Sequence, residues 1–228
     1  MPRHLSILAL AATMLLAPAA TAIPEGRIVI RSPASGTHLR LSASGSEILV
    51  SGPIEASSAG CRVAPGGVAC SLADVGSIEV ETGPAGDKVE VLSPLPVPLT
   101  AYLGDGSDKL IGNDETDVCY PQGTDRNRCI GGGGDDVCIS APVNTDCIGG
   151  PGDDYCKTED GSDGCWGGPG RDVCRMGAGQ DGCHGEGGDD QLYGGRGSDQ
   201  LYGGFGSDSC DGGPGVGRSR ECEIGRRR

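Results

Sequence analysis

The chain has 228 residues, including 43 glycines and 12 cysteines, and its 32 acidic and 18 basic residues give a formal net charge of −14. Five tyrosines, one tryptophan and one phenylalanine are too few aromatic residues for a core of large buried side chains. The acidic balance excludes a nucleic-acid binder, which would be basic, and glycines that do not recur at every third residue exclude collagen.

Residues 1–22 have the features of a secretory signal peptide. Arg3 gives a basic start, an apolar run covers 5–16, and Ala20-Thr21-Ala22 fits a small-x-small cleavage site. We expect cleavage after Ala22 and a secreted, extracellular product. No later apolar run reaches the roughly 18 residues of a membrane-spanning helix, so no membrane span is expected in the mature chain. All 12 cysteines follow this segment, and an even number in an exported chain favours disulfides.

Residues 23–100 contain short β-patterns. Apolar and polar residues alternate over 27–31 (RIVIR) and 77–81 (SIEVE), and glycine and proline separate such runs. The segment 95–99 (LPVPL) is typical of an extended connection. We expect 23–100 to form a small β-rich region, or irregular coils that cap the array after it, because repeat arrays need caps.

A nine-residue repeat dominates the rest of the chain. From Cys129 to Cys183, cysteines recur at intervals of nine residues. Five copies fit G-G-x-G-x-D-x-U-x, where U is apolar: 131–139 (GGGGDDVCI), 149–157 (GGPGDDYCK), 167–175 (GGPGRDVCR), 194–202 (GGRGSDQLY) and 203–211 (GGFGSDSCD). Weaker copies fill the run from 103 to 220, and 82–90 (TGPAGDKVE) is a degenerate copy upstream. A disordered glycine-rich linker would keep neither the aspartate nor the apolar position fixed.

This array resembles the RTX, or hemolysin-type, calcium-binding repeat. The resemblance implies an all-β fold, a right-handed parallel β-roll, which we assign to residues 101–222. In that fold each GGxGxD half is a calcium-binding turn and each x-U-x half is a short strand with U pointing inward. One coil takes two nonapeptides, so residues 18 apart stack. Calcium is therefore the expected cofactor and partner.

The residue types fit calcium binding on physical grounds. Glycine permits the positive φ of tight turns, and turn carbonyls and carboxylates are the hard oxygen ligands that calcium prefers. Stacked carboxylates repel unless a cation lies between them, so the roll should be loose without calcium and ordered with it. The expected turn backbone lies near Gly132, Gly134, Gly150, Gly152, Gly168, Gly170, Gly195, Gly197, Gly204 and Gly206.

The 18-residue period sorts the candidate metal ligands into two ladders. One is unbroken and consists of Asp117, Asp136, Asp154, Asp172, Asp190 and Asp208. The other consists of Asp108, Asp163, Asp181 and Asp199, and it is interrupted at Asn127 and Thr145, where calcium is not expected. Asp135, Asp153 and Asp189 stand beside the first ladder at a position that the family motif leaves open. We expect these three to be solvated turn residues.

Cysteine at the inward position departs from the usual repeat and predicts a roll stapled by disulfides. Strands within a sheet lie about 4.8 Å apart and facing sheets about 10 Å, whereas disulfide Cα atoms lie about 4.4–6.8 Å apart. This favours Cys61–Cys70, Cys119–Cys138, Cys129–Cys147, Cys156–Cys174, Cys165–Cys183 and Cys210–Cys222. The alternative joins facing sheets through 119–129, 138–147, 156–165 and 174–183, and requires an unusually thin roll.

No catalytic motif is recognisable: the sequence has neither a His-Glu-x-x-His zinc motif nor a Gly-x-Ser-x-Gly nucleophile turn. The sequence favours a secreted, non-enzymatic calcium-binding protein that serves the cell surface or matrix. The alternative is a hydrolase, toxin or adhesin that acts through residues 23–100 or through outward residues such as Tyr193 and Tyr202, with the roll as folding support. The basic residues of 223–228 are expected to form a solvated tail.

Overall fold

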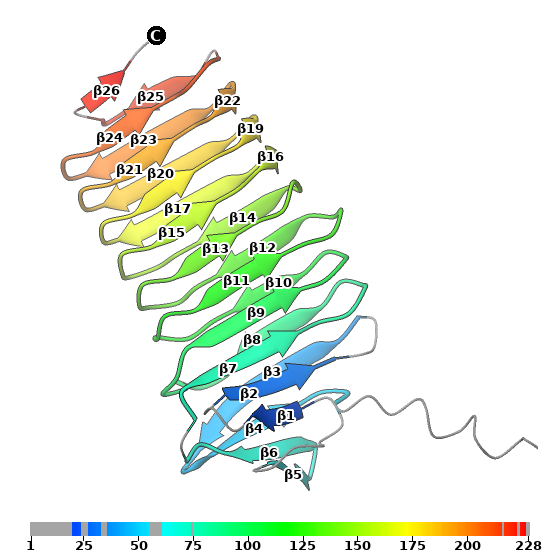
Figure 1. Cartoon of the computed structure of the whole chain (residues 1–228). Helices are drawn as coiled ribbons and strands as arrows, with labels where there is room; N and C mark the ends of the chain where they lie inside the picture. Colours follow the sequence, from blue (N-terminus) through cyan, green and yellow to red (C-terminus); the bar gives the residue numbers. More distant parts are fainter. Residues whose placement is uncertain are drawn as a thin grey trace, which may run out of the picture.

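The computed structural model describes residues 20–23, 27–32, 36–54, 61–73, 75–215, 217–222 and 224–226. All regular secondary structure in these residues is β-strand, arranged in three sheets. From residue 77 onward the strands stack in chain order into an elongated solenoid that ends at the red C-terminal strands, while the antiparallel strands between residues 38 and 71 lie at its other end (Figure 1). The all-β class and the parallel β-roll predicted from the sequence are confirmed.

Two long sheets form opposite walls of the solenoid, and a short third sheet runs along its turns. Sheet A has 11 strands, in the order β1 (Ala20–Ile23), β2 (Arg27–Arg31), β7 (Ser77–Glu81), β9 (Leu99–Leu103), β11 (Val118–Pro121), β13 (Val137–Ile139), β15 (Tyr155–Lys157), β18 (Val173–Arg175), β21 (Gln191–Tyr193), β24 (Ser209–Asp211) and β26 (Ile224–Arg226). Sheet B has 12 strands, in the order β25 (Arg218–Arg220), β23 (Gln200–Phe205), β20 (Gly182–Gly187), β17 (Gly164–Pro169), β14 (Thr145–Ile148), β12 (Asn127–Ile130), β10 (Lys109–Ile111), β8 (Lys88–Val91), β3 (His38–Ser44), β4 (Glu47–Ser51), β6 (Gly67–Ser71) and β5 (Cys61–Ala64). Sheet C has three strands, β16 (Asp160–Gly161), β19 (Ala178–Gly179) and β22 (Arg196–Gly197).

The coils repeat in register. Cys138 pairs with Cys156 in sheet A, and Cys147 pairs with Cys165 in sheet B, so positions 18 residues apart are neighbours in parallel strands. Successive strands of the chain alternate between the two sheets from β7 to β15, so one coil contains one strand of each. The nine-residue repeat is therefore half a coil, as the family resemblance implied.

The interior of the roll changes along its length. In the N-terminal coils it is aliphatic, with fully buried residues such as Ile30, Leu39 and Ile78. From Cys119 to Cys183 the inward positions are cysteines, followed by Leu192 and Leu201. Because cysteine is small, the Cα atoms of bonded facing cysteines lie only 6.1, 6.2 and 6.6 Å apart. This part of the roll is thus much thinner than the roughly 10 Å of ordinary facing sheets.

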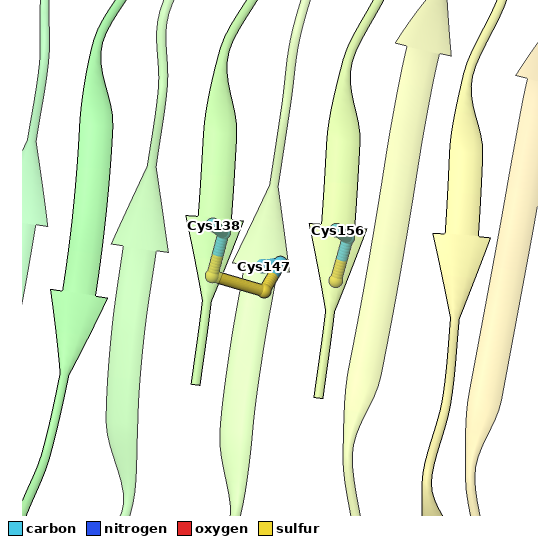
Figure 2. A group of neighbouring side chains, drawn as sticks. All are labelled: Cys138, Cys147 and Cys156. Carbon is cyan, nitrogen blue, oxygen red and sulfur yellow. A yellow bond between two sulfur atoms is a disulfide. The ribbon is translucent and has the colours of Figure 1, made fainter. Parts of the chain in front are cut away.

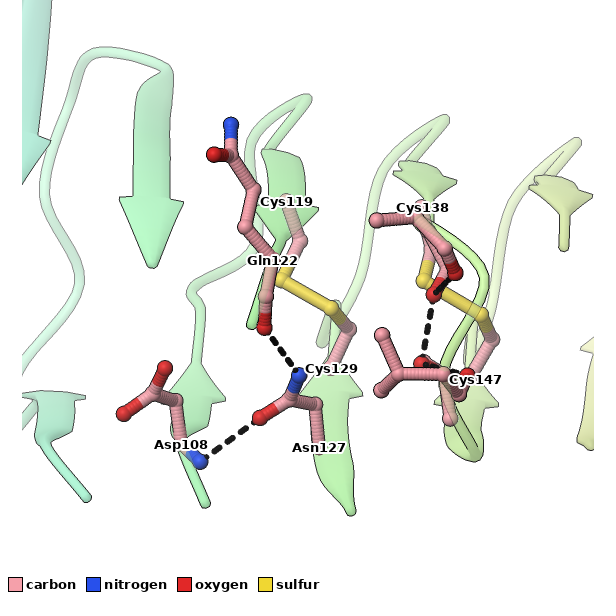
Figure 3. The surroundings of a disulfide bond; sticks show 11 residues. Asp108, Cys119, Gln122, Asn127, Cys129, Cys138 and Cys147 are labelled. Carbon is pink, nitrogen blue, oxygen red and sulfur yellow. Dashed lines mark hydrogen bonds between the residues drawn. A yellow bond between two sulfur atoms is a disulfide. The ribbon is translucent and has the colours of Figure 1, made fainter. Parts of the chain in front are cut away.

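The disulfides of the roll cross between the facing sheets, so the predicted same-sheet layout is wrong. The bonds are Cys119–Cys129 (Figure 3), Cys138–Cys147 (Figures 2 and 3) and Cys174–Cys183. The predicted bonds Cys119–Cys138, Cys129–Cys147, Cys156–Cys174 and Cys165–Cys183 are not formed. In-register neighbours of one sheet, such as Cys119 and Cys138, point their side chains in the same direction, whereas facing side chains point toward each other. Cys61–Cys70 and Cys210–Cys222 form as predicted, and Cys156 and Cys165 are buried thiols.

The N-terminal region is continuous with the roll. The predicted strands at 27–31 and 77–81 are β2 and β7, and these two strands pair in parallel within sheet A. An antiparallel ribbon of β3, β4, β6 and β5 ends sheet B. The expected boundary at residue 100 falls inside β9, which pairs with β7 and β11. Residues 23–100 thus supply the first coils and an end ribbon that covers their sheet edge.

The predicted signal peptide lies mostly outside the described residues, which begin at residue 20. The cleavage site expected after Ala22 falls within β1, which pairs antiparallel with β2. At the other end, residues 224–226 of the expected tail form β26 and pair with β24; residues 223, 227 and 228 lie outside the description. No helix long and apolar enough to cross a membrane occurs in the part of the chain that the structure describes.

Candidate metal centre

Two columns of buried carboxylates follow the edges of the roll where its strands begin. Ladder A precedes the strands of sheet A and contains Asp117, Asp136, Asp154, Asp172, Asp190 and Asp208. Ladder B lies at the start of the strands of sheet B and contains Asp87, Asp108, Asn127, Thr145, Asp163, Asp181 and Asp199. Every one of these residues is at most 6 % exposed. The structure therefore brings the predicted ligands together in the two expected ladders and adds Asp87 to the second.

One carboxylate oxygen of each aspartate ties adjacent coils together. The backbone N–H of Asp136 donates to Oδ1 of Asp154 at 2.8 Å, and the N–H of Asp154 donates to Oδ1 of Asp172 at 2.8 Å. Ladder B repeats the pattern: the N–H of Asp163 donates to Oδ1 of Asp181 at 2.9 Å. Each aspartate thus satisfies a backbone donor one coil away, which fixes the register of the turns.

The second carboxylate oxygen has no hydrogen-bond partner in the described part of the chain. This holds for the buried Oδ2 atoms of Asp87, Asp108, Asp136, Asp154, Asp163, Asp172, Asp181, Asp190, Asp199 and Asp208. An unpaired buried carboxylate oxygen is costly, because the ionised group has lost its water without gaining a donor. A column of such oxygens is the expected environment of a cation.

Asp117 differs from the other members of ladder A. Its Oδ2 accepts the backbone N–H of Asn113 at 2.6 Å, and its Oδ1 accepts the N–H of Leu99 at 2.9 Å. Asn113 stands where the best copies of the repeat have a second glycine, and its side-chain amide also donates to Asp117. Ladder A is therefore closed at its upstream end by hydrogen bonds, and its free oxygens begin at Asp136.

The pKa values of the ladder carboxyls reflect this burial. Loss of solvent raises the pKa of Asp136 to about 8 and those of Asp108, Asp154 and Asp172 to about 7, although backbone hydrogen bonds oppose the rise. The pKa of Asp117, Asp181 and Asp190 is raised to about 6 for the same reason, and that of Asp163 and Asp199 is also raised. Without a cation, several ladder carboxyls would hold a proton near neutral pH.

The turns before the ladders depend on glycine. All ten turn glycines named from the sequence have φ between +82° and +155°, which confirms the positive φ expected there. At Gly150 a Cβ atom would overlap the carbonyl oxygen of Gly132 in the preceding coil. At Gly149 it would overlap Oδ2 of Asp154. The glycines thus let carbonyl oxygens and the free carboxylate oxygens crowd into the same space.

Side chains alone do not complete a site. Among the described residues, no group of three acidic side chains brings its oxygens within coordinating range of one ion. Calcium takes six to eight oxygen ligands. The ligands beyond the stacked carboxylates would therefore have to come from the turn carbonyls that the glycines expose.

Ladder B is interrupted as predicted, and neutral groups satisfy the gap. Oδ1 of Asn127 accepts the N–H of Asp108, and its side-chain amide donates to the carbonyl of Gln122 (Figure 3). The Thr145 hydroxyl donates to the carbonyl of Val143 at 3.1 Å. No ligand is left over at these two positions, so the free oxygens of ladder B fall into an upstream pair and a downstream group of three.

The interrupted coils carry an ion-pair cluster that sequence reasoning missed. Asp146 is 1 % exposed on the outer side of β14 and accepts hydrogen bonds from Arg126 at 2.5 Å and Arg128 at 2.8 Å. Burial acts to raise the pKa of Asp146, but the hydrogen bonds from the two arginines outweigh it and lower that pKa. The cluster ties adjacent coils where ladder B has no free carboxylate. Its signal in the sequence, two arginines around Asn127, is too common to be diagnostic.

The other predicted positions are on the surface. Asp135, Asp153 and Asp189 are exposed, and the Oδ1 atom of each accepts a backbone N–H from the next coil, as when the N–H of Asp153 donates to Asp135 at 2.8 Å. Tyr193 lies on sheet A and Tyr202 on sheet B, so they do not share a surface. Tyr202 instead stacks on His184, which stacks on Trp166, and Arg175 lies over Tyr193.

Asp87 is a ladder residue that the ligands predicted from the sequence did not include. Its Oδ1 accepts the backbone N–H and the hydroxyl of Thr37, and its own N–H donates to Asp108 at 2.7 Å. The signal was present, because Asp87 occupies the aspartate position of the degenerate copy at 82–90.

Comparison with known protein families agrees with this geometry. Residues 148–174 and 184–217 match the RTX calcium-binding nonapeptide repeat in four copies. No curated protein and no solved structure matches the chain significantly. The chain thus carries RTX calcium-binding repeats on a parallel β-roll, and the matched segments contain the free carboxylate oxygens of Asp154, Asp172, Asp190, Asp199 and Asp208, and of Asp163.

Proposed function

We propose that this protein is an exported, non-enzymatic calcium-binding β-roll, and that calcium held at the stacked turns orders it. The observation that carries the proposal is the column of buried Oδ2 atoms without a partner, in segments that match a calcium-binding repeat. Like charges stacked at the distance of one coil destabilise the roll, and a divalent cation between them removes that repulsion.

The donor set fits calcium rather than a softer metal. The candidate ligands are carboxylate and carbonyl oxygens, which suit hard cations. On ladder A, Asp136, Asp154, Asp172, Asp190 and Asp208 would hold the ions; on ladder B, Asp163, Asp181 and Asp199 would, with Asp87 and Asp108 upstream. Calcium would supply positive charge and coordination of the turn carbonyls, and its binding energy would become folding energy.

Two observations support the exported, non-enzymatic part of the proposal. RTX repeat proteins are typically extracellular, and disulfides such as Cys138–Cys147 suit an oxidising compartment. Of the histidines within the described residues, His38 pairs with Glu90 and His184 is stacked between aromatic rings. Neither is placed beside a nucleophile in the way that a general base requires.

Calcium titration of the oxidised full chain tests the proposal. After treatment with a chelator, added calcium should increase the strand signal in circular dichroism and raise the melting temperature, with half-saturation at about 10⁻⁴–10⁻³ M. Magnesium at the same concentration should do less, because it demands a smaller octahedral site. If millimolar calcium and chelator both leave strand content and melting unchanged, a scaffold held by disulfides alone replaces the proposal.

Export is tested separately. N-terminal sequencing of the protein recovered from culture medium should begin at Ile23. Such cleavage would remove three of the four residues of β1 and leave β2 as the first strand of sheet A. A cell-retained product that keeps residues 1–22 would contradict the secretion part and leave the calcium part standing.

A further inference from the structure

Two thiols stand unbonded in a column of disulfides. Cys156 in β15 and Cys165 in β17 are buried, at 5 % and 3 % exposure, and neither is bonded. In sheet A, Cys156 lies between Cys138 and Cys174; in sheet B, Cys165 lies between Cys147 and Cys183. The two thiols therefore occupy the place of one more cross-roll pair, between two pairs that are bonded.

The disulfides on either side indicate that the roll is thin enough at this point for a further cross-roll bond. The bonded pairs on either side have Cα–Cα distances of 6.2 and 6.6 Å, both within the range of about 4.4–6.8 Å that disulfides allow. Because the strands pair in register on both walls, the intervening pair has to face across a roll of the same thickness.

The position of the pair relative to the ladders sets it apart from the two cross-roll disulfides that precede it in the chain. Cys156 follows Asp154 of ladder A by two residues, and Cys165 follows Asp163 of ladder B by two. Both aspartates have a free Oδ2. The pair 138–147 follows Asp136 and Thr145, and the pair 119–129 follows the satisfied Asp117 and Asn127. Cys156 and Cys165 thus belong to the first half-coils, counted from the N-terminus of the cysteine column, in which both ladders offer free carboxylate oxygens.

We propose that Cys156 and Cys165 are a redox-active dithiol that closes as a further cross-roll disulfide, and that calcium binding at the adjacent ladders favours closure. The inference rests on the proposed function, since calcium is the ligand that it couples to. The physical reason is that calcium holds the turns before β15 and β17 in place, which holds the two sulfur atoms opposite each other. The bond in turn removes chain freedom that calcium would otherwise have to order.

The oxidant is a small-molecule disulfide such as oxidised glutathione. One cysteine thiolate attacks it, forming a mixed disulfide and releasing one small thiol. The second cysteine thiolate then attacks the protein sulfur of the mixed disulfide and releases the second small thiol. The protein loses two protons and two electrons, and the small disulfide gains them. The cavity that the cysteines line holds about 20 Å³, room for about one water, so exchange requires the coil to open first.

Coupling between two sites is reciprocal, which makes the proposal quantitative. If calcium shifts the dithiol–disulfide equilibrium by a given factor, closure of the disulfide raises calcium affinity by the same factor. Couplings of this kind are typically about 5–150-fold. Closure of one dithiol releases two molecules of reduced glutathione, so we expect the value of [GSH]²/[GSSG] at half-closure to rise by a factor in that range when calcium is added.

The test is a glutathione redox titration of the full wild-type chain, in saturating calcium and in chelator. Thiols are trapped by alkylation, and the peptides that contain Cys156 and Cys165 are quantified by mass spectrometry. In parallel, calcium affinity is measured for the oxidised wild type and for Cys156→Ser/Cys165→Ser. The control is Cys61→Ser/Cys70→Ser, which removes a disulfide in the end ribbon, away from the ladders. Only the first variant should lose calcium affinity by the factor found in the redox titration.

The outcomes separate the inference from the function beneath it. Recovery of a Cys156–Cys165 linkage whose midpoint moves with calcium supports the inference. Equal alkylation of both cysteines with and without calcium, in protein that binds calcium, overturns it alone. A Cys147–Cys156 or Cys165–Cys174 linkage also overturns it; the sulfur atoms of each of these pairs lie within 4.8 Å of one another (Figure 2 shows Cys156 beside the Cys138–Cys147 bond). Absence of any calcium binding in the wild type overturns the proposed function. The wild-type titration decides even where the serine variants fail to fold.

Discussion

At the scale of single residues, the two oxygens of each ladder aspartate have different partners. Oδ1 of Asp172 accepts the N–H of Asp154, whereas Oδ2 of Asp172 has no partner within the described chain. One oxygen therefore has a structural role that an amide oxygen could also perform. The other is left for a cation, and an amide nitrogen in its place would be a poor ligand. Replacing aspartate with asparagine separates the two roles.

We predict that Asp154→Asn/Asp172→Asn lowers calcium affinity by at least about tenfold, which is the size of loss that substitutions around metal sites usually cause. In chelator at neutral pH the same variant should be more stable than the wild type, because it removes two buried carboxyls that lack a cation. Isothermal titration with calcium and urea unfolding in chelator measure the two effects. The matched control is Asp135→Asn/Asp153→Asn, which changes two outer carboxyls that accept the same kind of backbone bond. Equal losses of calcium affinity in both variants would refute the ligand assignment.

Two described residues other than glycine, Glu186 and Glu221, have a positive φ. Glu186 has φ of +76°, and its strand partners on either side are Gly168 and Gly204. A left-handed backbone costs a residue with a side chain about 1–2 kcal/mol. We predict that Glu186→Gly raises the free energy of unfolding by about 1 kcal/mol in saturating calcium, measured by urea denaturation.

The control for that substitution is Glu115→Gly. Glu115 lies in a turn beside ladder A, and its own φ is not positive. There the new glycine only adds freedom to the unfolded chain, so it should lower stability by about 0.4–1 kcal/mol. A loss of stability in both variants would mean that Glu186 makes a favourable contact that outweighs its backbone conformation.

At the scale of elements, each ladder behaves as one charged column whose state depends on pH. Burial raises the pKa of Asp136 to about 8 and that of Asp154 to about 7, above the ordinary value near 3.8 that these groups regain on unfolding. Between those values the folded calcium-free protein holds more protons than the unfolded chain. Its stability is therefore greatest below about pH 4 on account of these groups and falls as pH rises toward about 8.

We predict that, in chelator, the urea midpoint of the oxidised protein falls steadily between pH 5 and pH 8. In saturating calcium the fall should be abolished or reversed, because the ion competes with protons for the same carboxylates. Calcium affinity itself should increase over that interval. A calcium-free midpoint that rises with pH would show that the carboxylates are stabilised by something other than a cation.

The ladders were predictable from the sequence, whereas the cross-roll disulfide pairing was not. The glycine, aspartate and U positions predicted both ladders, because a fixed 18-residue period converts spacing directly into stacking, as Asp154 and Asp172 illustrate. The disulfide layout failed because it assumed sheets about 10 Å apart, while cysteine cores bring the Cα atoms of Cys138 and Cys147 to 6.2 Å. The hydrogen bond from the backbone N–H of Asn113 to Oδ2 of Asp117 depends on the path of one irregular turn, which no periodicity specifies.

At the scale of the whole molecule, the N-terminal and C-terminal halves of the solenoid are each stabilised by different interactions. The N-terminal coils bury large aliphatic side chains such as Ile30 and Leu39, and an antiparallel ribbon covers their edge. The coils from Cys119 onward bury mainly cysteines and contain most of the free carboxylate oxygens. Hydrophobic burial of small side chains contributes less free energy, so this half depends on disulfides and cations in its place.

This difference predicts that removal of calcium does not unfold the molecule uniformly. In hydrogen exchange followed by mass spectrometry, chelator should expose backbone amides of 148–217 while the amides of β2, β3 and β7 stay protected. Chelator and reductant together should extend exchange to the coils from Cys119 to Cys147. In these coils Asn127 and Thr145 leave ladder B without free carboxylates, so the disulfides contribute more of the stability. Equal loss of protection in both halves on chelation alone would mean that the solenoid folds as a single cooperative unit. Unequal loss would instead mean that the aliphatic coils stay folded without calcium and provide a template on which the calcium-dependent coils assemble.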